Sequence, residues 1–528
     1  MHRKEYIVAS LVFIVLCLSI FNTQHSKWVY DSTISADTGF FLEMTENIAN
    51  GNGPVSSIHA AMNNLFRNKV LSLSADELCT MELGRETEEF RRVSDSHKYY
   101  ITYLIAPLAK IFDVRAVLYM GQAAGFVLML YLVYRLLRRE QVPIALSWLF
   151  VGVVFVHPAW SQAVSGQLYV ERYFIPLGML FLYFLHQKEK NVVIPLYISA
   201  ILIALISERS SMVLGGYVVG YIILMWTSLK QDHKKHLMLI AAALIAFSVY
   251  EISILSNIHY QKSAFWPDSF EGLMYRLQNQ VFFDKLMTFL LFSILFLGIF
   301  AVLEWKLLLL ALAMMIPNIF GNVGGAEKTA YLTHYHTLYF PFLVFAATVG
   351  YAKLVNRVSI AQARFVVLPL TLVMMLFSML VSPYGRTVSF NNMINENALL
   401  KDLRILPDLF DRGSSLSKYV QRFDEIKDVI PEGSVVTSPE RVQAMLHNHV
   451  VNYYYPMGLD IANYAVLYIS RREGKEEYGG AISYKGQEEL KKMNTCLHER
   501  MVRAGYDFEN KIVINSYAII RRVPYSTN

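Results

Sequence analysis

Residues 34–54 read ISADTGFFLEMTENIANGNGP and follow an apolar run, Tyr6–Phe21, of roughly the length that crosses a membrane. The segment is acidic and has the periodicity of an amphipathic helix, which a Gly-Asn-Gly-Pro break ends. Asp37 stands at the predicted helix start, where a carboxylate can cap free backbone N–H groups. One face of the helix is apolar and is expected to rest on the membrane surface; it carries Phe40, Phe41, Met44 and Ile48. The pattern predicts a carboxylate held just outside a membrane span.

The composition indicates a polytopic membrane protein. Of 528 residues, 54% are hydrophobic and only 17% are charged, and the mean hydropathy is +0.34. A soluble domain would carry about a quarter charged residues. The net charge of +6 is modest, and no basic patch of the kind that binds nucleic acid appears, so nucleic acid is excluded as a partner.

The first apolar run is interpreted as a retained membrane span. A cleaved signal peptide would need a small-x-small site after the run, and none follows it. Cys17 is preceded by Leu16 and not by the small residue that a lipoprotein site requires. We therefore expect no cleavage.

Apolar segments of suitable length predict eleven spans in all. After the first, they are 116–135, 142–158, 173–186, 192–206, 211–228, 237–254, 286–303, 307–320, 337–352 and 365–381. Segment 99–112, YYITYLIAPLAKIF, is apolar but short, and it contains Pro107 and Lys110. We interpret it as a juxtamembrane or half-inserted helix; if it crosses the membrane, the count changes by one.

Lysine and arginine in the short connections predict the orientation. With a cytoplasmic N-terminus, the inner connections and the N-terminal segment carry 14 of these residues and the outer ones carry 6. The bias favours a cytoplasmic N-terminus and an external C-terminus. Loop 22–98 and the tail 382–528 then lie outside.

The tail is expected to form a small α/β domain, separate from a membrane domain that comprises residues 1–381 with the outer loop. Strands are predicted at GSVVTS, VVNYYYP, ANYAVLYIS and KIVINSYAIIRRV. Helices are predicted at 416–429, 439–447 and 485–505.

Ionisable residues near the spans are costly and so point to a functional cavity on the outer side. Two Glu-Arg pairs lie next to apolar runs with little loop to solvate them, and a third group precedes span ten. The residues are Glu171, Arg172, Glu208, Arg209, Lys328, His334, Tyr335 and His336. Taken singly, the pairs also fit interfacial anchors or structural ion pairs, and the histidines fit an aromatic belt. No H-E-x-x-H, Cys-x-x-Cys or nucleotide-binding G-x-x-x-x-G-K-[ST] motif is present.

The three cysteines form no metal or redox motif. Cys17 lies inside the first apolar run. Cys79 and Cys496 can pair if both face an oxidising compartment, and the sequence leaves that open.

Several segments resemble the GT-C superfamily of polyprenyl-phosphate-sugar-dependent glycosyltransferases. These are ADTGFFLEMTENIANGNGP after the first span and HKYYITYLIAPLAKIFDVRAVLYMGQAAG before and within the second. SERSSMVL, THYHTLYFPFLVFA and IPEGSVVTSPERVQAMLHNHVVNYYYP resemble more narrowly an uncharacterised bacterial and archaeal membrane family allied to that superfamily. The chain departs from protein mannosyltransferases in having Asp37-Thr38 where they have Asp-Glu, and its first loop has no Asp-x-Asp.

The resemblance implies an enzyme of the inner (cytoplasmic) membrane that works at its outer face. A polyprenyl-phosphate-linked sugar would be the donor, a glycan or lipid hydroxyl the acceptor, and the anomeric centre would invert. Asp37 would be the catalytic base, with Glu43 or Asp31 as alternatives. Arg172, Arg209 and Lys328 would contact phosphate, and the other polar residues named above would line the pocket. No cofactor is certain, and a divalent metal ion is left open.

A competing interpretation is a non-enzymatic transporter or lipid-handling protein with the same charged vestibule. Transporters often show inverted repeats with Gly- or Pro-broken spans in matching halves. The sequence has no such symmetry, and it has no tandem repeat.

Overall fold

The computed structural model describes most of the chain in two compact units. We call them the helical unit (Met1–Asn22, Asp95–Ile101 and Tyr119–Asp411) and the mixed unit (Thr23–Ser94, Thr102–Leu118 and Arg412–Asn528). The outer loop thus groups with the tail, whereas the predicted boundary at residues 381/382 stays a prediction. The described residues are 2–30, 36–67, 73–84, 91–92, 99–165, 168–187, 192–255, 269–271, 274, 297–320, 338–359, 363–381, 425–472, 475–479, 487–514 and 516–523.

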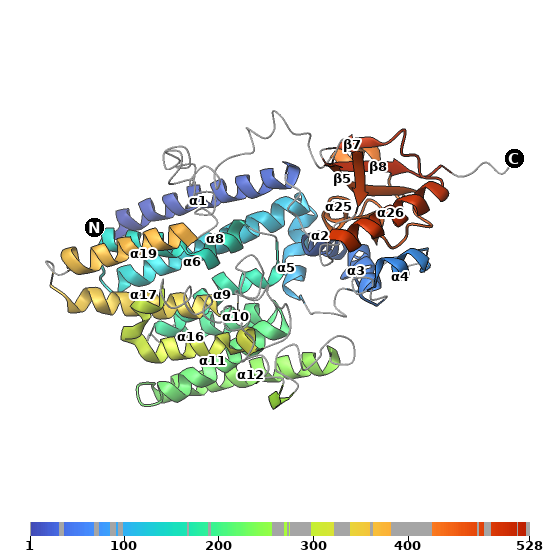
Figure 1. Ribbon diagram of the computed structural model, residues 1–528. Helices are drawn as coiled ribbons and strands as arrows, with labels where there is room; N and C mark the ends of the chain where they lie inside the picture. The colour runs from blue at the N-terminus through green and yellow to red at the C-terminus, as the bar shows by residue number, and fades with distance from the viewer. Residues whose placement is uncertain are drawn as a thin grey trace. The chain divides into compact units, whose positions relative to one another are not determined.

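The helical unit is a bundle (Figure 1), and each predicted span that is described in full coincides with a helix. The 3₁₀ turn η3 (Val170–Tyr173) leads directly into one of these helices. The helices are α1 (His2–Tyr30), α6 (Val114–Arg139), α7 (Ile144–Val156), α8 (Pro158–Ser165), α9 (Phe174–His186), α10 (Val193–Ala204), α11 (Glu208–Leu224), α12 (Gln231–Leu255), α15 (Ile299–Ala301), α16 (Trp305–Phe320), α17 (Phe340–Arg357) and α19 (Leu368–Val381).

The count of eleven full-length spans is not reproduced. Among the described residues, four helices are long and apolar enough to cross a membrane: Lys4–Asn22, Val114–Arg139, Gln231–Ser253 and Ile299–Ile316. Three shorter apolar helices accompany them, at Ile144–Val156, Val193–Ala204 and Phe365–Leu376. The reason is length, because a helix of 13 residues is about 20 Å long and the hydrocarbon core is about 30 Å thick.

One predicted loop was also wrong. The break expected between the spans 286–303 and 307–320 falls inside the continuous helical stretch Ile299–Ile316, where the 3₁₀ turn η7 (Val302–Glu304) joins α15 to α16. Apolar residues flank this turn on both sides. The first part of the earlier span, 286–296, lies outside the described residues.

Helix α17 forms the centre of the bundle. Every residue from Phe340 to Ala352 is buried, as expected for a helix that is apolar on all sides. Tyr217 stacks on Phe342 with ring centroids 4.1 Å apart, which joins α11 to α17. A Cβ added at Gly350 would overlap the backbone of Phe300, so α15 packs directly on α17 at this glycine.

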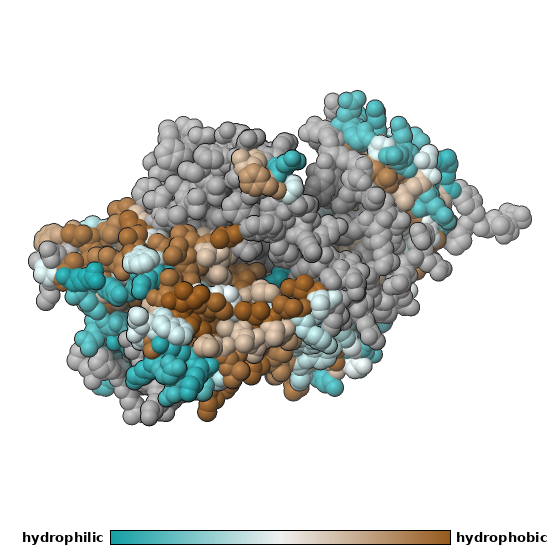
Figure 2. Space-filling view, turned by 90° about the horizontal axis from the view of Figure 1, so that it is seen from below, coloured by the Kyte–Doolittle hydropathy of each residue, from teal (hydrophilic) through white to brown (hydrophobic). Residues whose placement is uncertain are grey.

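The outside of the bundle is apolar. Large hydrophobic side chains are exposed on successive helices, among them Ile194 (70%), Ile223 (67%) and Leu239 (60%). Figure 2 shows hydrophobic residues over much of the described helical face. Exposed apolar surface of this extent is what lipid covers in a membrane protein.

The mixed unit contains a six-stranded sheet with the order β4-β3-β5-β8-β7, in which β6 pairs with β5. Strand β3 is parallel to β4 and β5, and the remaining pairs are antiparallel. The strands are β3 (Val435–Ser438), β4 (Val451–Tyr454), β5 (Tyr464–Arg472), β6 (Lys475–Gly479), β7 (Ile512–Ile514) and β8 (Tyr517–Arg521).

The predicted elements of the tail are confirmed with two refinements. KIVINSYAIIRRV forms the hairpin β7–β8, and β6 was missed because KEEYG is too polar to read as a strand. Helices α25 (Glu440–Met445) and α26 (Gln487–Arg503) occupy predicted helical segments, and of 416–429 only α24 (Ile426–Val429) and Glu425 are described.

The outer loop contributes a small pair of strands, β1 (Val55–Ser56) and β2 (Arg91–Arg92), and three helices to the mixed unit. The helices are α2 (Ala36–Ala49), α3 (Ser57–Arg67) and α4 (Ala75–Thr80).

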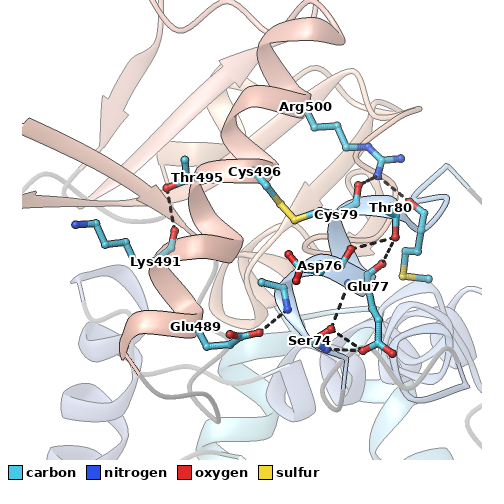
Figure 3. Close-up of a disulfide and its surroundings, with 12 residues drawn as sticks. Ser74, Asp76, Glu77, Cys79, Thr80, Glu489, Lys491, Thr495, Cys496 and Arg500 are labelled. Atoms are coloured by element: carbon cyan, nitrogen blue, oxygen red, sulfur yellow. Dashed lines mark hydrogen bonds between the residues drawn. A yellow bond between two sulfur atoms is a disulfide. The ribbon is translucent and has the colours of Figure 1, made fainter.

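A disulfide between Cys79 and Cys496 joins α4 to α26 (Figure 3), which answers the question that the sequence left open. Arg500 strengthens this junction: it pairs with Asp460 at 2.5 Å and donates to the carbonyl of Met81 at 2.7 Å. Loop and tail are therefore covalently joined.

Segment 99–112 contains the short helix α5 (Ile101–Ala109). Thr102 and Ala106 are buried on one side, while Leu104, Leu108 and Ile111 are 50–74% exposed. An apolar outer face directly before the long helix α6 suits a helix at the membrane surface.

Candidate functional site

Among the described residues of the helical unit, four are ionisable residues that the sequence predicted to matter, and three of them are buried. Glu171 and Arg172 belong to η3 and are 4% and 1% exposed. Glu208 is fully buried at the start of α11, and Arg209 beside it is half-buried. Charges buried among membrane helices are costly unless they have partners, and for that reason they are usually functional.

Tyr99 brings three of these residues together. Its hydroxyl donates to Glu171 Oε1 at 2.8 Å, and Glu208 and Arg209 are close enough to interact with it electrostatically. The backbone N–H of Ile101 donates to the carbonyl of Leu205 at 2.7 Å, which holds the tyrosine segment beside the connection between α10 and α11. The result is one polar cluster, which we call the tyrosine cluster: Tyr99, Glu171, Glu208 and Arg209.

Glu208 lies in this cluster because the sequence around it starts helix α11 at this point. Ser207 is the N-cap of α11, and its side chain accepts from the N–H of Ser210 at 3.2 Å. Ser248 of α12 donates to the carbonyl of Glu208 at 2.7 Å. An acidic residue in the first turn interacts favourably with the helix dipole, so the sequence Ser-Glu-Arg-Ser both begins the helix and presents the charge.

Arg172 is held separately, next to the cluster. Its Nη1 donates to the carbonyl of Ala163 at 2.5 Å, and its guanidinium lies 4.9 Å from the ring centre of Tyr169. It lines a narrow slot together with Gln122, Phe126, Tyr169, Tyr173 and Pro176. These side chains pack closely around the guanidinium and leave no room for even a water molecule, so Arg172 is packed into the bundle.

Asp37 is located in the mixed unit, in the first turn of α2. The prediction that it stands at the start of a helix is confirmed, because α2 begins at Ala36 and Asp37 is its second residue. Its side chain is half-buried.

The apolar face of α2 was also misassigned. Phe40, Phe41 and Met44 were expected on the membrane surface, but they are 7%, 1% and 1% exposed inside the mixed unit. Helices α25 and α3 pack on this face, and the ring of Phe40 lies 5.9 Å from that of His59. The periodicity was right, but protein covers the face instead of lipid.

Glu43, an alternative base, is buried and held by hydrogen bonds within the mixed unit. It is fully buried and accepts from Ser56 Oγ at 2.5 Å, Ser57 Oγ at 2.7 Å and the N–H of Ile58 at 3.1 Å. Burial raises the pKa of this carboxyl despite those hydrogen bonds. The side chain joins α2 to the start of α3.

Five predicted residues lie outside the described residues: Asp31, Lys328, His334, Tyr335 and His336. Their proposed roles stay predictions. Within the described part of the chain, no group of three or more His, Cys, Asp or Glu side chains is arranged to hold a metal ion.

Sequence reasoning missed the tyrosines as site residues. Tyr99 contacts Glu171, and the hydroxyl of Tyr100 donates to Glu251 Oε1 at 3.2 Å. Glu251 is 3% exposed in α12. The available signal was the Tyr-Tyr pair itself, since tyrosine hydroxyls in an otherwise apolar segment need partners when they are buried.

A family model, described as a predicted membrane protein family (DUF2079), matches residues 33–477, most of the chain. The chain belongs to the DUF2079 family. It is accordingly a multi-pass membrane protein, and the expected resemblance to a membrane protein family is confirmed. No curated protein matches this DUF2079 member.

Two solved structures are similar to this DUF2079 chain. ArnT from Cupriavidus metallidurans bound to undecaprenyl phosphate is 10% identical, with 90% of this chain and 99% of that chain covered and a TM-score of 0.46. The apo state of the same protein is 11% identical, with coverages of 92% and 100% and a TM-score of 0.46.

Replacement of Tyr99 by Phe should lower the stability of the full chain in lipid nanodiscs by about 1–3 kcal/mol, because a buried carboxyl loses a hydrogen-bond donor. Thermal unfolding measures the change. Tyr103→Phe is the matched control, since Tyr103 is 47% exposed on α5. Equal melting temperatures for the two variants would show that the hydroxyl of Tyr99 is not a buried anchor.

Proposed function

We propose that the chain is an integral-membrane glycosyltransferase that moves a sugar from a polyprenyl-phosphate carrier to an acceptor hydroxyl at the outer face of the membrane, with inversion. The observation that carries the proposal is the tyrosine cluster with Arg172 beside it. One arginine and two carboxylates buried among membrane helices, with the half-buried Arg209 beside them, are expensive to keep, and they suit a substrate that brings a phosphate group.

The arginines have the geometry that phosphate chemistry needs. A guanidinium offers five N–H donors, so Arg172 can hold Ala163 and still donate to a phosphate oxygen. Donors fixed in advance stabilise the charge that develops on the departing phosphate. The carboxylate of Glu171, held by Tyr99, is available to keep the arginines charged and oriented.

Inverting transfer also needs one base, and a half-buried carboxylate suits that role better than a sealed one. Asp37 is partly accessible, whereas Glu43 is fully buried and bound by three donors. The base takes the acceptor proton as the C–O bond forms. Because phosphate leaves readily, a second acidic group is less necessary than in glycoside hydrolysis.

The disulfide supports an external mixed unit. Disulfides form and persist in oxidising compartments, and the pairing of Cys79 with Cys496 agrees with the orientation favoured by the Lys and Arg bias. We propose that the N-terminus is cytoplasmic and that the C-terminal domain faces the periplasm or the exterior.

Undecaprenyl phosphate is the probe we choose for the carrier, because the solved ArnT complex contains it. The acceptor in this proposal is a glycan or lipid hydroxyl. The proposed pocket also includes four residues outside the described part of the chain: Lys328, His334, Tyr335 and His336.

The orientation predicts the outcome of reporter fusions. A reporter active only outside the cytoplasm should give signal when fused to Asn528 and none when inserted at 230–235, at the start of α12. Thiol labelling of Cys79 and Cys496 by a membrane-impermeant maleimide should require prior reduction. The reverse fusion pattern would put the proposed site on the wrong side of the membrane.

Asp37→Asn should reduce transfer from an undecaprenyl-phosphate-linked sugar by about 10²–10⁴-fold, the usual contribution of general-base catalysis. Asn keeps the side-chain volume, so the melting temperature should change little. Turnover by the full chain in proteoliposomes is the measurement.

Asp76→Asn is the matched control for this variant, because Asp76 is also the second residue of a mixed-unit helix and is exposed. It should keep turnover within a few-fold. Normal turnover by Asp37→Asn would remove Asp37 as the base. Carrier binding by the wild type without any transfer would favour the lipid-handling alternative.

A further inference from the structure

Helix α2 is almost completely buried, and α25, α3 and β1 of the mixed unit pack on it. Every residue from Thr38 to Thr45 is buried, while Asp37 at one end is half-buried. A helix enclosed in this way has little freedom to rotate or slide. What surrounds α2 therefore determines where the Asp37 carboxylate lies.

The first constraint is next to Asp37. A Cβ added at Gly39 would lie 2.6 Å from Cα of Ala444 and 2.9 Å from Cδ1 of Ile58. Real Cβ atoms do not approach a backbone atom so closely, so only glycine allows α2 and α25 to pack at this distance. The contact is two residues from the proposed base, and the tail supplies its other half.

The second constraint is at the end of α25. Asn448 has a φ of 51°, in the left-handed region that ends helices. Its Nδ2 donates to Glu46 Oε2 at 2.7 Å, and its Oδ1 accepts from Asn47 Nδ2 at 3.3 Å. One asparagine of the tail thus makes two hydrogen bonds to α2.

The neighbouring histidine does not replace these bonds. His447 Nε2 lies 4.0 Å from Glu46 Oε2, but burial lowers the pKa of His447 to about 3, so the ring is neutral near pH 7. Its Nδ1 lies 2.8 Å from the carbonyl of Ala444. The directional contact with Glu46 is therefore the one from Asn448.

We infer that the tail segment 439–448 positions the proposed base, with Gly39 and Asn448 as the positioning residues. This inference rests on the proposed function. The two contacts are about two turns apart along α2, so together they fix both its rotation and its distance from α25. A displacement of about 1 Å at a reacting group can cost about 100-fold in rate, so loss of either contact should act on turnover more than on carrier binding.

Asn448→Gly tests the inference cleanly, because glycine accepts the left-handed backbone while both side-chain hydrogen bonds disappear. In the full chain in nanodiscs, kcat for an undecaprenyl-phosphate-linked sugar should fall about 10–100-fold. KM and the affinity for undecaprenyl phosphate should stay within about three-fold, because carrier binding is assigned to the helical unit. Backbone amides of residues 36–49 should exchange faster with deuterium.

Asn510→Gly is the matched control. Asn510 is exposed in the same tail, and its Nδ2 donates to Asp507 Oδ2 at 2.8 Å with no contact to α2. It loses a comparable hydrogen bond and should leave kcat and the exchange of α2 unchanged. In Gly39→Ala the added methyl group would overlap Ala444 and displace α25. This variant should therefore lower kcat as Asn448→Gly does.

The outcomes separate the inference from the function on which it rests. Loss of turnover in Asp37→Asn together with normal kcat and normal α2 exchange in Asn448→Gly would overturn the positioning role alone. A fall in kcat with an equal fall in carrier affinity would also overturn it, since that pattern indicates general disruption. Normal turnover in Asp37→Asn would overturn the base assignment, and the positioning role with it.

Discussion

Burial of charge among apolar helices is the constraint on which the rest of the structure depends. Glu171, Arg172 and Glu208 are almost completely removed from solvent in a unit whose outer surface is apolar. Such groups must find partners within the protein. Tyr99 donates to Glu171, and Arg172 donates to the carbonyl of Ala163, so these contacts tie η3 to the tyrosine segment and to α8.

In the mixed unit, the constraint is to join two segments that are far apart in the sequence. A loop after the first span and a tail after the last are joined into one body by the Cys79–Cys496 disulfide, by Arg500 and by the packing of α2 on α25. The proposed base belongs to this body and the proposed phosphate contacts belong to the helical unit.

Local patterns in the sequence predicted the elements well. Apolar segments of membrane length located every fully described span, and alternation with turn residues located five of the six strands of the sheet. Long-range facts were less accessible. The face of α2 with Phe40, Phe41 and Met44 has the same pattern whether lipid or protein covers it, so the sequence could not assign the cover.

For the candidate site too, local charge patterns were visible in the sequence, whereas long-range contacts were not. The Glu-Arg pairs stood out because charge beside apolar runs is rare, but nothing local showed that Tyr99 would join Glu171 to residues 208–209. The pairing of Cys79 with Cys496, 417 positions apart, likewise depends on tertiary structure. Apolar windows also did not report helix length: among the described residues, several predicted spans are helices of only 12–14 residues.

The central claim is that the two arginines of the candidate site, the buried Arg172 and the half-buried Arg209, receive the phosphate of a lipid carrier. An experimental density map of the full chain in nanodiscs with undecaprenyl phosphate tests it most directly. The account predicts phosphate density within hydrogen-bonding distance, about 2.7–3.2 Å, of the guanidinium of Arg172 or Arg209. A well-ordered carrier whose phosphate lies away from both arginines would contradict it.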